Sequence, residues 1–174
     1  MLYMGTGTHG PDFAAIRPAL DRLWAEREGQ FDVTLIGIAA DIDPAPWLQR
    51  LAPPADAIAY PRFVRWLRGQ GPFDIGLAPL ADTRFNSAKS DIKLLDYLAL
   101  GILPVVQDCP AYRLDPAMAE VAVHATDWFE ALRGLIDDRD AARRQATLGA
   151  TLLWEKRTVA SIAEGMIGRL ESLL

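Results

Sequence analysis

The stretch FDIGLAPLADTRFNSAKSDIKLLDYLALGILPVVQ, residues 73–107, decides the fold. Apolar residues at 73–78 predict a strand, and the polar residues 79–90 that follow predict a loop. Residues 91–100 have helical spacing and stop at Gly101, after which the apolar run 103–107 predicts a second strand. A strand, a helix and a strand in this order predict a βαβ unit with two parallel strands.

The same alternation extends to both ends of the chain. Further strands are predicted at residues 2–4, 32–38, 57–60 and 121–124, and further helices at residues 12–28, 61–69, 127–137, 140–148 and 154–173. We therefore expect an α/β fold, Rossmann-like with three α/β/α layers and a mostly parallel six-stranded sheet in the order 3-2-1-4-5-6. We expect one domain over residues 1–174, because no repeat or linker interrupts the pattern, and an irregular connection at the prolines between residues 44 and 54.

Composition excludes several classes of protein. Hydrophobic residues make up 51% of the chain and charged residues 24%, which excludes a disordered chain. The formal net charge of −5 argues against nucleic acid as the main partner. The single cysteine, Cys109, can form neither an internal disulfide nor a cysteine-based metal cluster, and two scattered histidines predict no metal site. The longest apolar run, residues 97–106, is too short to span a membrane, and no signal peptide is visible, so we expect a cytoplasmic protein without a transmembrane segment.

The topology predicts where a ligand would bind. In sheets of this kind the ligand crevice lies at the carboxyl ends of the strands where the strand order reverses, here between the first and fourth strands. The loop after the first strand reads Gly5-Thr6-Gly7-Thr8-His9-Gly10, and its glycines let backbone N–H groups approach an anion before a helix begins. The acidic residue of the dinucleotide fingerprint comes too late, at Asp41, so NAD is not predicted, and a flexible turn stays an alternative.

The loop after the fourth strand leads into a helix with a polar face. Lys93 and Asp96 share that face with Tyr97 and Leu100, so a lysine that could meet a phosphate lies beside a carboxylate that could accept hydrogen bonds from ribose hydroxyls. A solvated Lys–Asp surface pair explains the same spacing equally well. Ser90 or Asp91 can cap the helix. By itself, His9 is more readily explained as a turn residue than as a general base.

A family resemblance lies in the same region. Residues 90–101, SDIKLLDYLALG, followed by Pro104-Val105-Val106, resemble the signature in the C-terminal half of GT-B glycosyltransferases. They are most similar to the retaining family 4, or group 1, whose members read roughly Lys-x-x-Glu-Tyr-x-Ala-x-Gly-x-Pro-Val-Val there. The strand before this signature is resembled by residues 74–80. The opening strand of that half is resembled by residues 3–6, and the start of its last helix by residues 154–156.

The resemblance implies that this domain binds a nucleotide-sugar donor. The carboxylate matching Asp96 would contact the ribose, and Lys93 and Lys89 would neutralise the diphosphate, so that no metal or other cofactor is required. The donor-binding residues expected on these grounds are Gly5, Thr6, Gly7, Thr8, His9, Lys89, Ser90, Asp91, Lys93 and Asp96. No catalytic residue is assigned.

The sequence departs from the family pattern at three places. Asp96 stands where glutamate is usual. The family's first acidic residue, which contacts the sugar, falls on Ala88, so it is missing or replaced by Asp91 or Asp82. Residues 6–9 replace the arginine and lysine that usually follow the first strand.

The function expected from the resemblance is the donor-binding domain of a retaining glycosyltransferase. A GT-B enzyme has two such halves, so we expect the chain to be the C-terminal part of a longer protein, with any membrane attachment through the missing N-terminal, acceptor-binding domain. The isolated domain should be inactive, because the acceptor is not held beside the donor. A non-catalytic module that binds sugar nucleotides or proteins, a sugar-nucleotide epimerase fragment and a domain without a nucleotide remain alternatives.

Overall fold

The sheet of this protein is entirely parallel in the computed structural model, which describes residues 1–5, 9–37, 42–57 and 59–171. Within these residues its strands are β1 (Leu2–Met4), β2 (Val33–Ile36), β3 (Leu48–Leu51), β4 (Ile75–Ala78), β5 (Leu103–Gln107) and β6 (Val123–Ala125). They lie in the order β3-β2-β1-β4-β5-β6, so the expected fold class and strand order are confirmed. The order reverses between β1 and β4, as expected.

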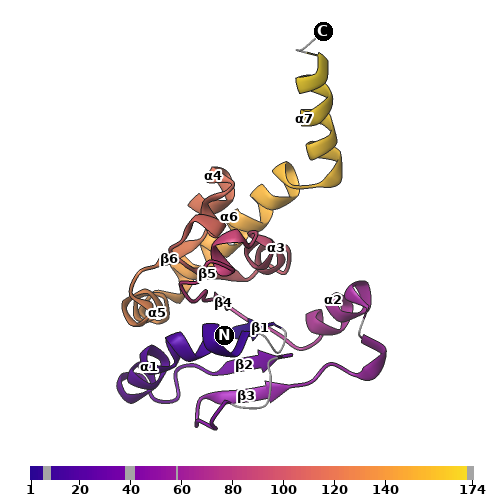
Figure 1. Ribbon diagram of the computed structural model, residues 1–174. Coiled ribbons are helices and arrows are strands. Elements are labelled where there is room, and N and C mark those ends of the chain that lie inside the picture. Colours follow the sequence, from indigo (N-terminus) through magenta and orange to yellow (C-terminus); the bar gives the residue numbers. More distant parts are fainter. Residues whose placement is uncertain (6–8, 38–41, 58, 172–174) are drawn as a thin grey trace.

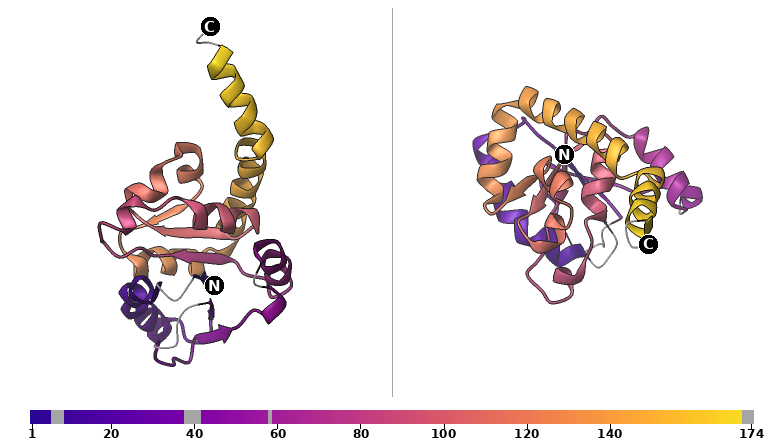
Figure 2. Two further views of the ribbon diagram at one scale, coloured as in Figure 1. Left: turned by 45° about the vertical axis from the view of Figure 1, so that its right-hand side comes forward. Right: turned by 90° about the horizontal axis from the view of Figure 1, so that it is seen from above.

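Helices cover both faces of the sheet and complete the three layers (Figures 1 and 2). They are α1 (Gly10–Glu26), α2 (Tyr60–Arg68), α3 (Ile92–Ala99), α4 (Pro116–Glu120), α5 (Trp128–Asp137), α6 (Arg139–Lys156) and α7 (Val159–Glu171), with short 3-10 turns η2 (Ala55–Ala57), η3 (Asn86–Ala88) and η4 (Pro110–Arg113). Helices α1 and α5 pack together on one face, and α3 and α6 pack together on the other.

In the described part of the chain, two large apolar cores separate these layers. The helical spacing of Phe13, Ile16, Leu20 and Leu23 places all four α1 side chains against the sheet, where they meet the buried face of α5. On the opposite face, α3 and α6 pack closely because Gly149 lacks a Cβ atom, which would lie 2.5 Å from Leu98 Cδ2. Helix α7 projects beyond these layers in Figures 1 and 2.

The predicted strand at residues 57–60 is wrong. The third strand is β3, which begins four residues after Pro44, in the stretch expected to be an irregular connection. It is an edge strand that pairs only with β2, and Gln49 and Arg50 at its centre are exposed, so it lacks the apolar run that marks the inner strands. Residues 55–57 form η2, and α2 already begins at Tyr60, with Pro61 in its first turn.

The C-terminal helices also differ from expectation. The predicted helix 140–148 continues through Gly149 to Lys156 as α6, so the break expected before residue 154 lies instead between α6 and α7. Helix α4 was not predicted, and the carboxylate of Asp115 caps it by accepting hydrogen bonds from two backbone N–H groups. Within the described ranges, no helix is long and apolar enough to cross a membrane.

Candidate functional site

The site is organised by the gap that opens between β1 and β4. The two strands pair at Leu2 and Gly76, and beyond that point the Tyr97 side chain of α3 bridges them. Its hydroxyl donates to the Leu77 carbonyl at 2.9 Å and lies 3.4 Å from the Met4 N–H, which donates to it. The ring fits because Gly76 has no side chain: a Cβ atom there would lie 2.4 Å from the ring. Tyr97 therefore closes the floor of the predicted crevice.

The loop after β1 begins at Gly5, whose N–H donates to the Ile36 carbonyl of β2. Gly37 packs directly on this turn, with a φ of 74° and no room for a Cβ atom, which would lie 2.3 Å from the Gly5 carbonyl oxygen. Residues Thr6, Gly7 and Thr8, expected to bind the donor, lie outside the described residues.

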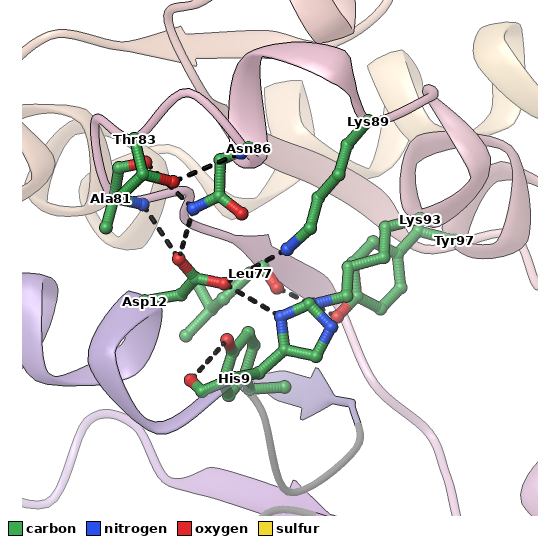
Figure 3. Close-up of polar contacts among 10 residues, drawn as sticks. His9, Asp12, Leu77, Ala81, Thr83, Asn86, Lys89, Lys93 and Tyr97 are labelled. Carbon is green, nitrogen blue, oxygen red and sulfur yellow. Dashed lines mark hydrogen bonds and ion pairs between the residues drawn. The ribbon is translucent and has the colours of Figure 1, made fainter.

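The buried carboxylate of Asp12, in the first turn of α1, joins the loop after β1 to the loop after β4 (Figure 3). Its Oδ1 accepts hydrogen bonds from the Ala81 N–H at 2.8 Å and from the Asn86 side-chain amide at 2.9 Å, both on the loop after β4. Its Oδ2 lies 2.8 Å from His9 Nδ1 and 3.6 Å from Lys89 Nζ. Burial alone would raise the pKa of this carboxyl, but the hydrogen bonds from Ala81, His9 and Asn86, with Lys89, lower it, so Asp12 is ionised at neutral pH.

His9 lies at the amino-terminal end of α1, with its ring 14% exposed. Because the ionised Asp12 can only accept, His9 Nδ1 carries the proton and donates it to Asp12. Burial lowers the pKa of His9. The hydrogen bond to Asp12 raises this pKa in part, and the positive charges of Lys93 and Lys89 lower it further. His9 is therefore a neutral imidazole at neutral pH.

Lys93, on α3, directs its ammonium into the same cluster. Its Nζ lies 3.4 Å from His9 Nδ1, which already donates to Asp12, and 4.8 Å from the centre of the Tyr3 ring. Among the described residues no carboxylate lies within ion-pair distance of this ammonium. Burial lowers the pKa of Lys93 to about 8, partly offset by Asp12. A shielded cation without a direct counter-ion is electrostatically suited to receive an anion.

The cluster formed by His9, Asp12, Asn86, Lys89 and Lys93 thus contains two ammonium groups and one carboxylate. Lys89 also lies over the exposed Phe85 ring, with its Nζ 5.3 Å from the ring centre. Below pH 8 this cluster carries a net positive charge at the carboxyl edge of the sheet. An anionic group with several acceptor oxygens, such as a phosphate, matches that charge.

Asp96 stands apart from this cluster although it shares the helix face of Lys93. Its Oδ1 accepts a hydrogen bond of 2.5 Å from the Tyr60 hydroxyl at the start of α2. Burial raises the pKa of Asp96, and the hydrogen bond from Tyr60 lowers it in part. Among the described residues its Oδ2 has no hydrogen-bond partner, so this oxygen can accept a hydrogen bond from a ligand hydroxyl.

Asp91 and Ser90 have different surroundings from Lys93. Asp91 is 7% exposed, and its Oδ2 lies 3.2 Å from a guanidinium nitrogen of Arg157, the C-cap residue of α6. It stands at the N-cap of α3 without a side-chain capping bond, and Ser90 is exposed beside it. The structure thus brings His9, Lys89 and Lys93 together, while Asp96 meets Tyr60 and Asp91 meets Arg157.

Asp12 and Asn86 were missed as site residues by the sequence analysis. One signal was present for Asp12: it lies four residues before Ile16, so it falls on the apolar face of its own helix, where a carboxylate needs partners. Asn86, 7% exposed, has no comparable signal, because only the folded loop buries it.

No group of three or more histidine, cysteine or acidic side chains that could hold a metal ion occurs in the part of the chain that the structure describes. Comparison with protein-family models, with curated proteins and with solved structures finds no match. The likeness of residues 90–106 to glycosyltransferases therefore stays a prediction, and functional inference depends on the geometry of the cluster.

Proposed function

We propose that this domain binds the donor of a retaining nucleotide-sugar glycosyltransferase, with the diphosphate at Lys93 and Lys89. In the reaction, the bond between the sugar carbon and the diphosphate oxygen breaks and its electron pair leaves with the diphosphate. The two ammonium groups stabilise the charge that develops there. The acceptor, held by a second domain of a longer polypeptide, forms a bond from its hydroxyl oxygen to the sugar carbon, and the hydroxyl proton passes to the departing diphosphate.

The observation that carries this proposal is the unpaired ammonium of Lys93 at the strand-order reversal. Lys93 reaches His9 and Tyr3 from a distant part of the sequence, and no described carboxylate neutralises it directly. Removing a cation from water costs free energy, and a bound phosphate offsets part of that cost. The resemblance of residues 90–106 to the donor-binding signature of GT-B glycosyltransferases agrees with this assignment.

Asp96 supplies a complementary contact in the proposal. With Oδ1 held by Tyr60, its other oxygen would accept a hydrogen bond from a ribose hydroxyl. The ribose and the diphosphate would then lie along one face of α3.

The proposal is tested by calorimetric titration of the protein with UDP, GDP and ADP and with their parent nucleosides. We expect at least one diphosphate to bind, and Lys93→Ala to weaken it by about 10- to 150-fold, the loss expected for one charge-assisted hydrogen bond. The affinity for the nucleoside should change little, because a nucleoside has no phosphate for Lys93 to contact.

Lys156→Ala is the matched control, since Lys156 is an exposed lysine in the last turn of α6. It should leave diphosphate affinity unchanged. The absence of binding by all three diphosphates at millimolar concentration, or equal affinity in the parent and Lys93→Ala proteins, would overturn the proposal.

A non-catalytic sugar-nucleotide-binding module is the second candidate, favoured by Ala88 and by Asp91. Ala88 offers no carboxylate to a sugar, and Asp91 is engaged with Arg157. The two candidates share the nucleotide site and differ in turnover. Sugar transfer to an acceptor by the whole polypeptide would support the glycosyltransferase, and diphosphate binding without turnover would support the module.

A further inference from the structure

The lysines of this chain are Lys89, Lys93 and Lys156, and each has different surroundings. Lys156 is exposed at the end of α6, where water stabilises its charge. The ammonium of Lys89 lies 3.6 Å from the Asp12 carboxylate. Lys93 is half-buried, and among the described residues no carboxylate lies within ion-pair distance of it. Lys93 therefore lacks both of the features that stabilise the charge of the other two lysines.

The contacts of Lys93 Nζ do not hold its protons either. His9 Nδ1, at 3.4 Å, already donates its own proton to Asp12, so it cannot accept one from Lys93. The Tyr3 ring offers only its π face, with its centre 4.8 Å from Nζ. Lys89 brings a second positive charge into the same cluster, as Figure 3 shows. An ammonium in such surroundings loses a proton easily, and the neutral amine that results is a nucleophile.

The titration of Lys93 agrees with these contacts. Burial lowers the pKa of Lys93 from 10.5 to about 8, which Asp12 opposes in part and Lys89 reinforces. At pH 8 about half of the Lys93 side chains are neutral, whereas a lysine with the ordinary pKa is roughly 0.3% neutral. The titratable groups that face Lys93 are Tyr3, His9, Asp12 and Lys89, and of these only Asp12 is negative at this pH.

The charge of the cluster selects the kind of reagent that would meet this amine. A net positive charge raises the local concentration of an anion such as a phosphate. An acyl phosphate joins a phosphate to an electrophilic carbonyl carbon in one small molecule. The ammonium of Lys89 would stabilise the negative charge of its phosphate while the amine of Lys93 meets the carbonyl carbon.

We infer that Lys93 is a modification site at which acyl phosphates acylate the Nζ atom. The lone pair of the neutral amine forms a bond to the carbonyl carbon. The bond from that carbon to the phosphate oxygen breaks, and its electron pair leaves with the phosphate. The surplus proton on nitrogen passes to the departing phosphate, so the products are an amide on Lys93 and inorganic phosphate.

This modification goes beyond the proposed function, because it requires the cationic cluster and not a nucleotide. Only its consequence rests on the proposed function. An amide carries no charge, so an acylated Lys93 would no longer attract the diphosphate. Acylation would then regulate binding at the proposed diphosphate site.

The test incubates the protein with acetyl phosphate at pH 8 and follows acetylation at each lysine by tandem mass spectrometry. Lys156 is the control within the same molecule, since it is exposed and far from the cluster in sequence. We expect acetylation of Lys93 to be at least about tenfold faster than that of Lys156, because far more of its amine is neutral. Equal rates at the two lysines would overturn the proposal.

A second reagent separates the attraction of phosphate from the reactivity of the amine. The N-hydroxysuccinimide ester of acetic acid is uncharged and carries no phosphate, so the preference for Lys93 over Lys156 should be at least about threefold smaller with it. An equal preference with both reagents would overturn the role of acyl phosphates.

Lys89→Met tests the same role from the side of the protein. It removes the second ammonium of the cluster, so acetyl phosphate should acetylate Lys93 at least about threefold more slowly and Lys156 at the parent rate. Far-ultraviolet circular dichroism would verify that the variant is folded. An unchanged rate at Lys93 in the folded variant would contradict guidance of the phosphate by Lys89.

The outcome is independent of the nucleotide titrations. If no diphosphate binds the parent protein, the proposed function fails, and selective acetylation of Lys93 would still support the modification site. If a diphosphate binds, fully acetylated Lys93 should weaken it by about 10- to 150-fold, as Lys93→Ala does. Unchanged diphosphate affinity after acetylation of Lys93 would overturn the regulatory consequence.

Discussion

Asp12 and Asp91 are both aspartates buried at the amino-terminal end of a helix, and they have opposite surroundings. Asp12 is 3% exposed and Asp91 7% exposed. The guanidinium of Arg157 contacts two carboxylates, that of Asp91 and that of Asp115, which lies 2.8 Å away. The single carboxylate of Asp12 contacts neutral His9 and lies 3.6 Å from the ammonium of Lys89. It also accepts hydrogen bonds from two neutral donors, the Ala81 N–H and the Asn86 amide. The ammonium of Lys93 lies on the far side of His9.

The difference lies in the balance of charge. The cluster at Arg157 has more negative than positive groups, and it ties α3, α4 and α6 together at their ends. The hydrogen bond to Asp115, its largest influence, raises the pKa of Arg157, so this cation is held by its protein partners. The cluster at Asp12 has more positive than negative groups, so it has charge left over for a ligand. We therefore interpret the first as a structural clamp and the second as a binding site.

Removal of the Asp12 carboxylate should have the largest effect. Asp12→Ala leaves the Ala81 N–H and the Asn86 amide without an acceptor in a buried place, so we expect a loss of about 3 kcal/mol in the free energy of unfolding. Urea denaturation measures this loss. Asp12→Asn, which keeps one oxygen acceptor, should cost less. Equal stability of the Asp12→Ala and parent proteins would contradict the role of Asp12 in joining the two loops.

Removal of the Arg157 guanidinium should destabilise the protein and leave the proposed diphosphate site unchanged. Arg157→Ala leaves Asp91 buried without its cation, and because Arg157 is 23% exposed, water compensates in part, so we expect a loss of about 2 kcal/mol. Diphosphate affinity should be unchanged. Arg144→Ala, at an exposed arginine of the same helix, is the control for stability. A large loss of diphosphate affinity in Arg157→Ala would erase the distinction between clamp and site.

The charge of Lys93 should give a dependence on pH with opposite signs for stability and for binding. Because burial lowers the pKa of Lys93 from 10.5 to about 8, the unfolded chain holds a proton between these values that the folded chain has released. Stability should therefore rise with pH across this window relative to Lys93→Met, which lacks the group. Diphosphate affinity should fall over the same window, because Lys93 loses the charge that attracts phosphate.

Urea denaturation and calorimetry between pH 7 and pH 10.5 follow the two trends. His9, Asp12 and Lys89 face Lys93, and the Lys93→Met reference retains all three. Identical pH profiles for the parent and Lys93→Met proteins would show that Lys93 is not the titrating group.

Much of the fold was predictable from local pattern. The strands at residues 2–4 and 103–107 were predicted with the observed bounds, because inner parallel strands are continuous apolar runs. Edge strand β3 was missed because its half-exposed residues give no continuous apolar run. The full length of α6 was missed because a glycine often marks the end of a helix, whereas Gly149 is needed for close packing against Leu98. The place expected for a ligand crevice followed from the predicted strand order, and the structure confirms that order.

The sequence by itself determined the fold class, the strand order and the two loops that meet at the reversal, because hydrophobic periodicity and the handedness of βαβ connections act over short distances. It also predicted Lys89, Lys93 and His9 as donor-binding residues. Only the tertiary structure decided which polar residues act together. Lys93 and Asp96 are three residues apart yet have different partners, whereas Asp12 and Asn86 are 74 residues apart and share a hydrogen bond. The physical reason is burial: a polar group withdrawn from water must find a partner across the fold, and local spacing does not specify which one.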